Sequence, residues 1–124
     1  MLDSIELTTG DAPELAVIWL HGLGADGHDF EPIVPELGLR FPVRFVFPNA
    51  PVRPVTINGG MAMRAWYDIL GLDRRSQEDA AGIRASAAAV TRLIDREIER
   101  GMSSERIVLA GFSQGGAITL QAGL

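Results

Sequence analysis

The residues with the clearest chemical potential form a Gly-Phe-Ser-Gln-Gly segment at positions 111–115. A serine hydroxyl is a weak nucleophile, so it must stand clear of the chain to reach both a carbonyl carbon and a base. A sharp turn from strand to helix achieves this, and glycines two residues before and after the serine remove side chains that would clash. The spacing therefore predicts a nucleophilic Ser113 supported by Gly111 and Gly115.

The sequence on either side of Ser113 fits this interpretation. After Arg106, residues 107–110 are apolar and partly β-branched, as in a buried strand, and a helix is expected to start at residue 115 or 116. Such a helix would direct its first N–H groups at an anion formed at the serine. The alternative is a glycine-rich turn of a nucleotide-binding fold, but the lysine of a P-loop and the G-x-G-x-x-G spacing are both missing.

A His-Gly-Leu-Gly segment at residues 21–24 is expected to supply part of the oxyanion hole. Acyl transfer needs at least two N–H donors directed at the developing oxyanion. One is the N–H after the nucleophile, on Gln114, and the other is expected from this loop, on Leu23. Gly22 lets the backbone approach closely, and His21 is expected to orient the loop. The alternative is an ordinary turn between a strand and a helix.

The elements that must position these residues alternate between strand and helix, which predicts a mostly parallel sheet covered by helices. A continuous apolar run predicts a buried strand at residues 16–20, and two mostly apolar runs that end at Pro or Gly predict further strands at residues 43–47 and 106–110. Residues 4–7 are expected to add a weaker leading strand.

Two further helices are expected before Ser113. The stronger one spans about residues 79–100 and stops at Gly101. Apolar residues at 3.6-residue spacing define its expected buried face, with Glu97 as the one charge near it: Ile83, Ala87, Val90, Ile94 and Ile98. A shorter helix is expected to begin near Asp29 as its cap, with Pro35 shortening or kinking it.

Residues 51–73 form a long connection with three turn signals, followed by Met and aromatic residues. Long connections in compact domains are often functional, although an ordinary irregular crossover is the alternative.

Composition excludes several classes of function. The 124 residues carry a net charge of −5, and their eleven arginines are scattered, so no nucleic-acid partner is expected. The chain has no cysteine and two histidines, which match no zinc spacing, so neither a metal nor a cofactor is expected. Residues 15–20 are the longest apolar run, far short of the roughly 20 residues of a membrane span, and no targeting segment is visible. The chain is therefore expected to be cytoplasmic.

Four segments together resemble the bacterial carboxylesterase and acyl-protein thioesterase family: residues 21–24, 53–60, 66–68 and 111–116. They occur in the same order and cover nearly the whole chain, and the Arg-Pro-Val-Thr-Ile-Asn-Gly-Gly block at 53–60 is the most specific. The resemblance implies a three-layer, lidless α/β hydrolase that cleaves carboxylic esters or thioesters. It also implies that residues 51–73 shape an apolar acyl site, with Met63 and Trp66 nearby.

The sequence departs from this family in one respect. The family supplies its Asp and His after the serine, but residues 114–124 contain neither. His28 is expected to be exposed, and neither it nor His21 is expected to act as the base, so Asp26 and Asp68 have no histidine to orient.

Residues 1–124 are therefore expected to be the N-terminal part of a single hydrolase domain, inactive alone. Such a part would leave the Ser113 strand unpaired on one side, and two copies could pair there as a homodimer. The alternative is a non-catalytic fragment that acts as a structural or self-associating module.

Overall fold

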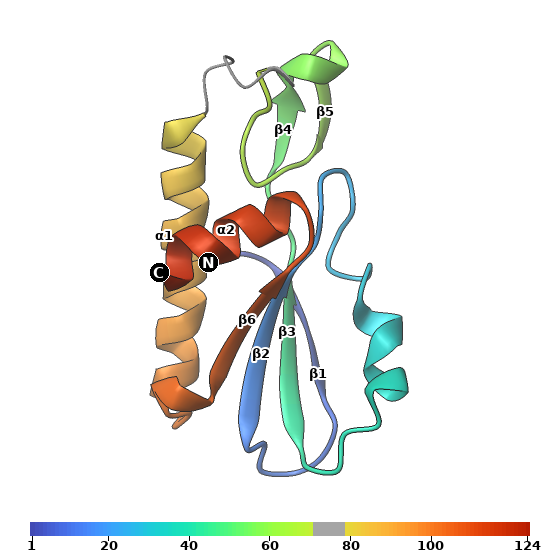
Figure 1. Cartoon of the computed structure of the whole chain (residues 1–124), viewed down its shortest axis with the longest axis vertical. Coiled ribbons are helices and arrows are strands. Elements are labelled where there is room, and N and C mark those ends of the chain that lie inside the picture. The colour runs from blue at the N-terminus through green and yellow to red at the C-terminus, as the bar shows by residue number, and fades with distance from the viewer. Residues whose placement is uncertain (71–78) are drawn as a thin grey trace.

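The computed structural model describes residues 1–70 and 79–124 as a layered α/β unit (Figure 1). Its elements are β1 (Ser4–Thr8), β2 (Leu15–Leu20), the 3-10 helix η1 (Glu31–Leu37), β3 (Val43–Pro48), β4 (Val52–Val55), the 3-10 helix η2 (Thr56–Asn58), β5 (Met61–Arg64), α1 (Ala80–Glu99), the 3-10 helix η3 (Ser104–Arg106), β6 (Ile107–Gly111) and α2 (Gln114–Gly123).

The main sheet has the strand order β1-β3-β2-β6. β2 runs parallel to both β3 and β6, with Ile18 opposite Val46 on one side and Leu109 on the other. β1 runs antiparallel along the outer edge of β3. Within the described residues β6 pairs with β2 alone, so the Ser113 strand forms the other edge, as expected. The carboxyl ends of the three parallel strands meet at one end of the sheet and gather the loops that follow them.

The two faces of the sheet are covered by different elements, which gives three layers (Figure 1). On one face Ile18, Leu20 and Val46 pack with side chains of α1 and α2, including Val90 and Ile118. On the other face the apolar residues of β2 and β3 pack against η1: Val17, Val43, Phe45 and Phe47 with Val34. Fully burying each such side chain contributes about 1.5–3 kcal/mol, so both clusters hold the strands that carry the candidate site.

Helix α1 lies nearly where it was expected, and most of its expected face does meet the core, because Val90 is buried and Ile83 and Ile94 pack against the core cluster. Asp79 caps it by accepting a hydrogen bond from the Gly82 N–H at 3.0 Å. Its buried residues are Gly82, Ser86, Val90, Leu93 and Glu97. Ile98, expected inside, is exposed, and the fully buried Glu97 takes its place. A charge is stable there because two arginines pair with it, as described below.

The short helix expected to be capped by Asp29 is instead the 3-10 helix η1, which begins after Phe30 and has no side-chain cap. The Asp29 N–H donates to the Asp26 carbonyl and closes a turn before the helix. Pro32 and Pro35 lack N–H donors, so a regular α-helical ladder cannot form here.

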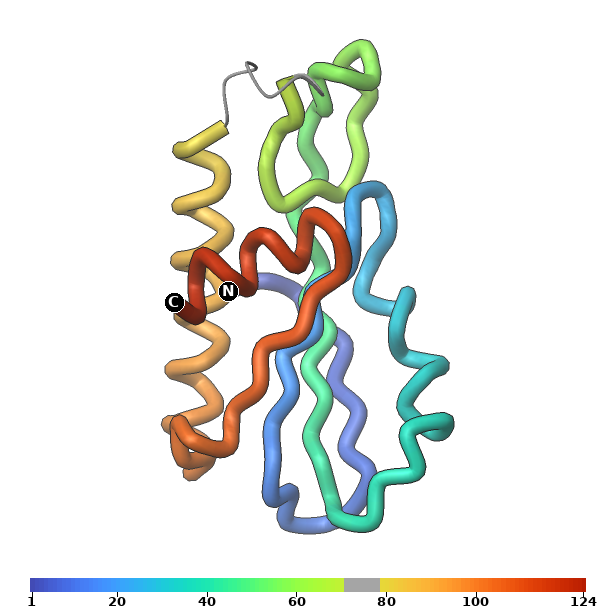
Figure 2. Tube along the Cα trace, in the orientation of Figure 1, coloured from blue at the N-terminus to red at the C-terminus, as the bar shows by residue number. Residues whose placement is uncertain are grey.

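The 51–73 segment contains a β-hairpin, so the alternative of an irregular crossover is wrong for its described part. Strands β4 and β5 pair antiparallel from Val52–Arg64 to Val55–Met61. Gly59 and Gly60 have φ of 67° and 80° in the turn, which confirms the turn signal of that glycine pair. Residues 71–73 lie outside the described residues. The hairpin projects past the carboxyl ends of the parallel strands, beside the loop after β2 (Figure 2).

Across the described residues, no helix has both the length and the apolarity needed to cross a membrane.

Candidate active site

Ser113 occupies a sharp turn between β6 and α2, and it is exposed. Its φ of 54° and ψ of −116° are strained for a residue with a side chain. Backbone hydrogen bonds hold the turn on both sides: the Phe112 N–H donates to the Leu20 carbonyl at 3.1 Å and the Ala117 N–H to the Ser113 carbonyl at 3.1 Å. This geometry displays the serine hydroxyl above the sheet.

The two glycines of the motif are required by close packing. A side chain at Gly111 would lie 2.5 Å from the Gly115 carbonyl oxygen, and one at Gly115 would lie 2.5 Å from the Leu20 carbonyl oxygen. Neither position has room for a methyl group. Gly22 of the neighbouring loop is also tight, because a Cβ there would lie 3.2 Å from the Phe112 ring, and it would lie 3.6 Å from the Ser113 Cβ. The structure thus brings the 21–24 loop directly beside the serine.

His21 is buried, and both of its ring nitrogens are engaged by backbone groups. Nε2 accepts a hydrogen bond from the Ala50 N–H at 3.0 Å, so the neutral ring carries its proton on Nδ1, which donates to the Gly22 carbonyl at 2.7 Å. Burial lowers the pKa of the imidazole below its ordinary value of 6.5. A neutral ring with both nitrogens occupied fixes the loop and is not free to take a proton from Ser113.

His28 is exposed, as expected, with 69% of its side chain accessible. Its Nδ1 lies 2.8 Å from a Glu31 carboxylate oxygen on η1. Among the described residues, no hydrogen bond joins either histidine to Ser113.

The two N–H groups expected to form the oxyanion hole have no acceptor among the described residues. Gln114 is the first residue of α2, where helix N–H groups lack intrahelical partners. Leu23 lies between two anchored positions, because the Gly24 N–H donates to the Arg64 carbonyl at 2.9 Å and the Ala25 N–H to the Gly22 carbonyl at 3.3 Å. Within the described residues, neither N–H is therefore engaged by another backbone group.

Trp66, which the family resemblance places near the acyl site, is fully buried. Its indole N–H donates to the His21 carbonyl at 2.8 Å, and the indole and imidazole ring centroids are 5.2 Å apart. Any influence of Trp66 on a substrate therefore passes through the His21 loop. Met63 is half-buried, and its sulfur lies 3.9 Å from where a Gly24 side chain would begin, so it borders this loop.

Sequence reasoning missed the role of the Gln114 side chain. It is buried, its Oε1 accepts from the Trp66 N–H at 2.7 Å, and its Nε2 donates to the Tyr67 carbonyl at 2.8 Å. The Gly-x-Ser-x-Gly pattern specifies nothing at this position, so no sequence signal could have found it.

Residues 5–124 match the protein-family model described as phospholipase/carboxylesterase. The chain belongs to the phospholipase/carboxylesterase family. The resemblance inferred from the motifs and the α/β-hydrolase fold that it implies are both confirmed.

The chain is similar to two fungal proteins that are both named acyl-protein thioesterase 1. The one from Cryptococcus neoformans is 41% identical over 96% of this chain and 52% of its own length. The one from Schizosaccharomyces pombe is 42% identical over 99% of this chain and 55% of its own length. The crystal structure of Zea mays acyl-protein thioesterase 2 superposes with a TM-score of 0.83 at 29% identity, over 98% of this chain and 51% of that one. The chain thus spans about half the length of the curated relatives it matches.

The two remaining segments that resemble the family, residues 53–60 and 66–68, stabilise the hairpin and supply none of the proposed reacting groups. Asp68 of the Trp-Tyr-Asp segment accepts hydrogen bonds from the hydroxyl and the N–H of Thr56, and these bonds lower the pKa of its carboxyl. The Asp68 N–H in turn donates to the Asp79 carboxylate at 2.8 Å. Asp68 therefore ties the hairpin to the start of α1.

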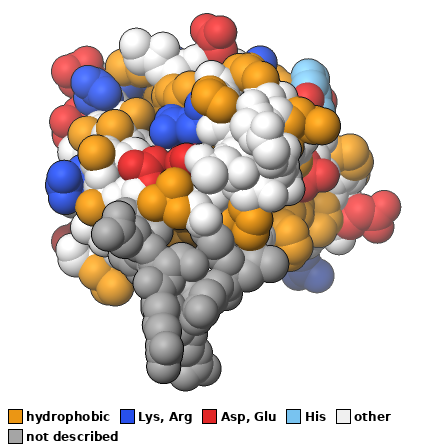
Figure 3. All heavy atoms as spheres, turned by 90° about the horizontal axis from the view of Figure 1, so that it is seen from above, with side chains coloured by type: hydrophobic (Ala, Val, Ile, Leu, Met, Phe, Trp, Pro, Cys, Tyr) orange, Lys and Arg blue, Asp and Glu red, His pale blue; other side chains and the backbone are white. Residues whose placement is uncertain are grey.

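Viewed from the hairpin end, apolar side chains lie among charged and polar groups (Figure 3). Val52 and Met61, on facing strands of the hairpin, are both exposed. The described part of the 51–73 segment thus offers apolar surface close to the loop that carries Leu23.

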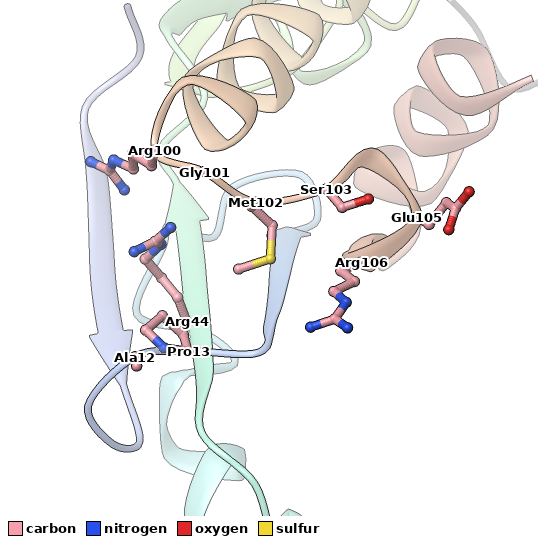
Figure 4. Close-up of a pocket in the computed structure, with 9 residues that line it drawn as sticks. All are labelled: Ala12, Pro13, Arg44, Arg100, Gly101, Met102, Ser103, Glu105 and Arg106. Carbon is pink, nitrogen blue, oxygen red and sulfur yellow. The ribbon is translucent and has the colours of Figure 1, made fainter.

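A cavity of about 520 Å³ lies at the opposite end of the sheet, where β2 and β6 begin (Figure 4). Arg44 and Arg100 line it, and both pair with the buried Glu97, at 2.7 and 2.9 Å. Arg100 also pairs with Glu6, which lowers the pKa of that carboxyl. Since Ser113 follows the far end of β6, this cavity is separate from the candidate active site. Among the described residues no group of three or more His, Asp or Glu side chains could hold a metal ion.

Proposed function

We propose that this chain carries the nucleophile and the oxyanion hole of a serine hydrolase that cleaves carboxylic esters or thioesters. The observation that carries the proposal is the exposed, strained Ser113 beside the 21–24 loop, with the N–H groups of Leu23 and Gln114 unpaired among the described residues. This arrangement is the one required for nucleophilic acyl transfer.

In the proposed reaction the Ser113 Oγ attacks the acyl carbonyl carbon while a base takes its proton. The carbonyl oxygen becomes an oxyanion, which the Leu23 and Gln114 N–H groups stabilise. The carbon–oxygen or carbon–sulfur bond of the substrate then breaks, and the leaving alcohol or thiol takes the proton from the base. A water molecule hydrolyses the acyl-serine, which releases the carboxylic acid and restores the hydroxyl.

The proton carriers are proposed to lie outside these 124 residues. His21 is fully engaged by backbone groups, and His28 is paired with Glu31 at the surface. The proposed acid and base are an Asp and a His that follow Ser113 in the full-length polypeptide, as the order Ser, Asp, His in such hydrolases suggests.

The acyl group is proposed to lie along the β4–β5 hairpin. Met63 borders the 21–24 loop, which carries Leu23, and the exposed side chains of Met61 and Val52 extend the apolar surface. Relatives named acyl-protein thioesterases support a thioester among the substrates. That the protein is cytoplasmic and that it forms a homodimer both stay predictions.

The proposal is tested with a fluorophosphonate probe on the full-length polypeptide. Labelling should reach Ser113 and be abolished by Ser113→Ala, because the probe requires an activated serine. Ser103→Ala, at a serine outside the motif, is the control and should leave labelling unchanged. Labelling that persists in Ser113→Ala would show that another residue is the nucleophile.

A further inference from the structure

Residues 64–67, which close the hairpin, make hydrogen bonds to the loop that carries one proposed oxyanion donor. The Arg64 carbonyl accepts from the Gly24 N–H at 2.9 Å, and the Trp66 indole N–H donates to the His21 carbonyl at 2.8 Å. These two bonds bracket Leu23, so the direction of its N–H depends on where the 64–67 segment lies.

The same segment makes hydrogen bonds to the residue that carries the other donor. The Gln114 side chain accepts from the Trp66 N–H and donates to the Tyr67 carbonyl, at 2.7 and 2.8 Å. Gln114 is 4% exposed, so these bonds are shielded from water and hold its side chain firmly. Because the side chain and the N–H belong to one residue, the anchor also orients the proposed donor.

Ser86 fixes the 64–67 segment from a third direction. This buried serine lies in the N-terminal half of α1, and its hydroxyl donates to the Trp66 carbonyl. The N–H, the carbonyl and the indole N–H of Trp66 are thereby all engaged, each by a different part of the chain. Such a fully satisfied buried residue has little freedom to shift.

We propose that the 64–67 segment sets the spacing between the two oxyanion donors, and that Ser86 is a positioning residue that acts on them through Trp66. The inference rests on the proposed function. The donors lie on separate loops, after β2 and after β6, and the 64–67 segment bridges both. Small misplacement of donors weakens binding of the transition state more than binding of the substrate. A change at Ser86 should therefore act on kcat rather than on KM.

The first test is Ser86→Ala in the full-length polypeptide, assayed with a p-nitrophenyl ester. Alanine favours the helix and removes only the hydroxyl. We expect kcat to fall about 10-fold, less than the ~10²–10³ that follows loss of a donor, and KM to stay within about twofold. Thr91→Ala is the matched control, because this exposed residue of α1 makes the same kind of bond, to the Ala87 carbonyl at 3.0 Å. Its kcat should be unchanged.

The second test is a double-mutant cycle with Trp66→Phe, which keeps an aromatic ring and removes the indole N–H. If both residues act through one segment, Ser86→Ala should lower kcat less in the Trp66→Phe background than in the wild type. Thr91→Ala and Trp66→Phe should combine independently. Ser86→Thr retains the hydroxyl and should recover most of the kcat lost in Ser86→Ala.

The outcomes separate the two proposals. If the wild-type protein hydrolyses no ester and its Ser113 is not labelled, the proposed function is wrong, and this inference fails with it. An active, labelled wild type with unchanged kcat in Ser86→Ala overturns the inference alone. The same holds if Ser86→Ala lowers only the unfolding temperature, because that result assigns Ser86 a purely structural role.

Discussion

The two ends of the parallel strands are held by different kinds of interaction. At the carboxyl end, neutral hydrogen bonds from His21, Trp66 and Gln114 fix the loops, and Ser113 stands exposed among them. At the amino end, Glu97 is buried between Arg44 and Arg100. The proposed catalytic groups and the buried ion pairs therefore lie at opposite ends of one sheet.

Neutral anchors suit the carboxyl end because they fix direction without adding a competing charge. An oxyanion there must draw its stabilisation from N–H groups that have no other acceptor. A carboxylate close to those donors would repel the oxyanion and raise its energy. At the amino end the proposed reaction has no charged intermediate, so a buried ion pair there does not interfere with it. The following tests probe this contrast from the largest expected effect to the smallest.

The largest effect is expected when residues 1–124 are expressed alone. Since neither histidine of the chain is free to act as base, turnover of p-nitrophenyl butyrate should fall at least about 10⁴-fold below the ordinary value of about 10 per second. Size-exclusion chromatography should show dimers or aggregates, because Val108, Phe112 and Leu120 are exposed on or beside the outer strand β6. A compact monomer with ordinary turnover would show that the carboxyl end is complete without a further base.

Gly115→Ala should damage the carboxyl end, while Gly116→Ala should not. The first change places a methyl group 2.5 Å from the Leu20 carbonyl oxygen, and we expect a loss of about 3 kcal/mol or more in the free energy of unfolding. The second meets its nearest neighbour, the Gly111 carbonyl oxygen, at 3.4 Å. It should leave stability equal or raise it by up to about 1 kcal/mol, because alanine favours a helix. Urea denaturation of both variants measures these changes. Equal free energies of unfolding would contradict the close packing at Gly115.

Glu97→Gln should weaken the amino end and leave the chemistry intact. Removing one partner of a buried ion pair costs about 3–5 kcal/mol, and here Arg44 would lose the carboxylate it pairs with while Arg100 would keep only Glu6. The control is Glu99→Gln, on the exposed face of the same helix, which should change stability by less than about 0.5 kcal/mol. Below the unfolding transition, Glu97→Gln should retain the kcat of the wild type. A large drop in kcat in the folded variant would mean that the two ends are coupled.

The smallest effect concerns pH. Burial lowers the pKa of His21 in the folded state below its unfolded value of 6.5, so the unfolded state binds the proton more readily. The stability contributed by neutral His21 is therefore fully present above pH 6.5 and is lost as the pH falls towards the folded pKa. Urea unfolding at pH 7.5 and 5.5 should show this loss, and a His21→Gln variant should be less stable at pH 7.5 and lose less on acidification. Equal losses in both proteins would assign the pH dependence to other groups.

Sequence patterns predicted the sharp turn at Ser113 and the strands of the sheet because both depend on local backbone geometry. The glycines around Ser113 and the β-branched runs of β2, β3 and β6 are required by backbone geometry that short segments specify. The exchange of Ile98 for Glu97 on the buried face of α1 was not predicted, because Glu97 pairs with arginines on β3 and at the end of α1, and no short segment reveals such a pairing.

The parts of the site that escaped prediction depend on contacts between distant segments. The Gln114 side chain and Trp66 meet across 48 residues of sequence, and their hydrogen bonds exist only once the hairpin has folded back. The burial of Trp66 follows from the same fold-back, since Met and aromatic residues after a turn are as typical of an exposed surface as of a core.

The buried indole of Trp66 also has an optical consequence. The chain has two tryptophans, and Trp66 is fully buried with its N–H held by a carbonyl, while Trp19 is half-buried and stacks on Phe30. In a Trp19→Phe variant the remaining emission should be shifted to the blue and respond weakly to an aqueous quencher such as iodide. Its wavelength and quenching would report, without substrate or turnover, whether the loop that begins at His21 is in place.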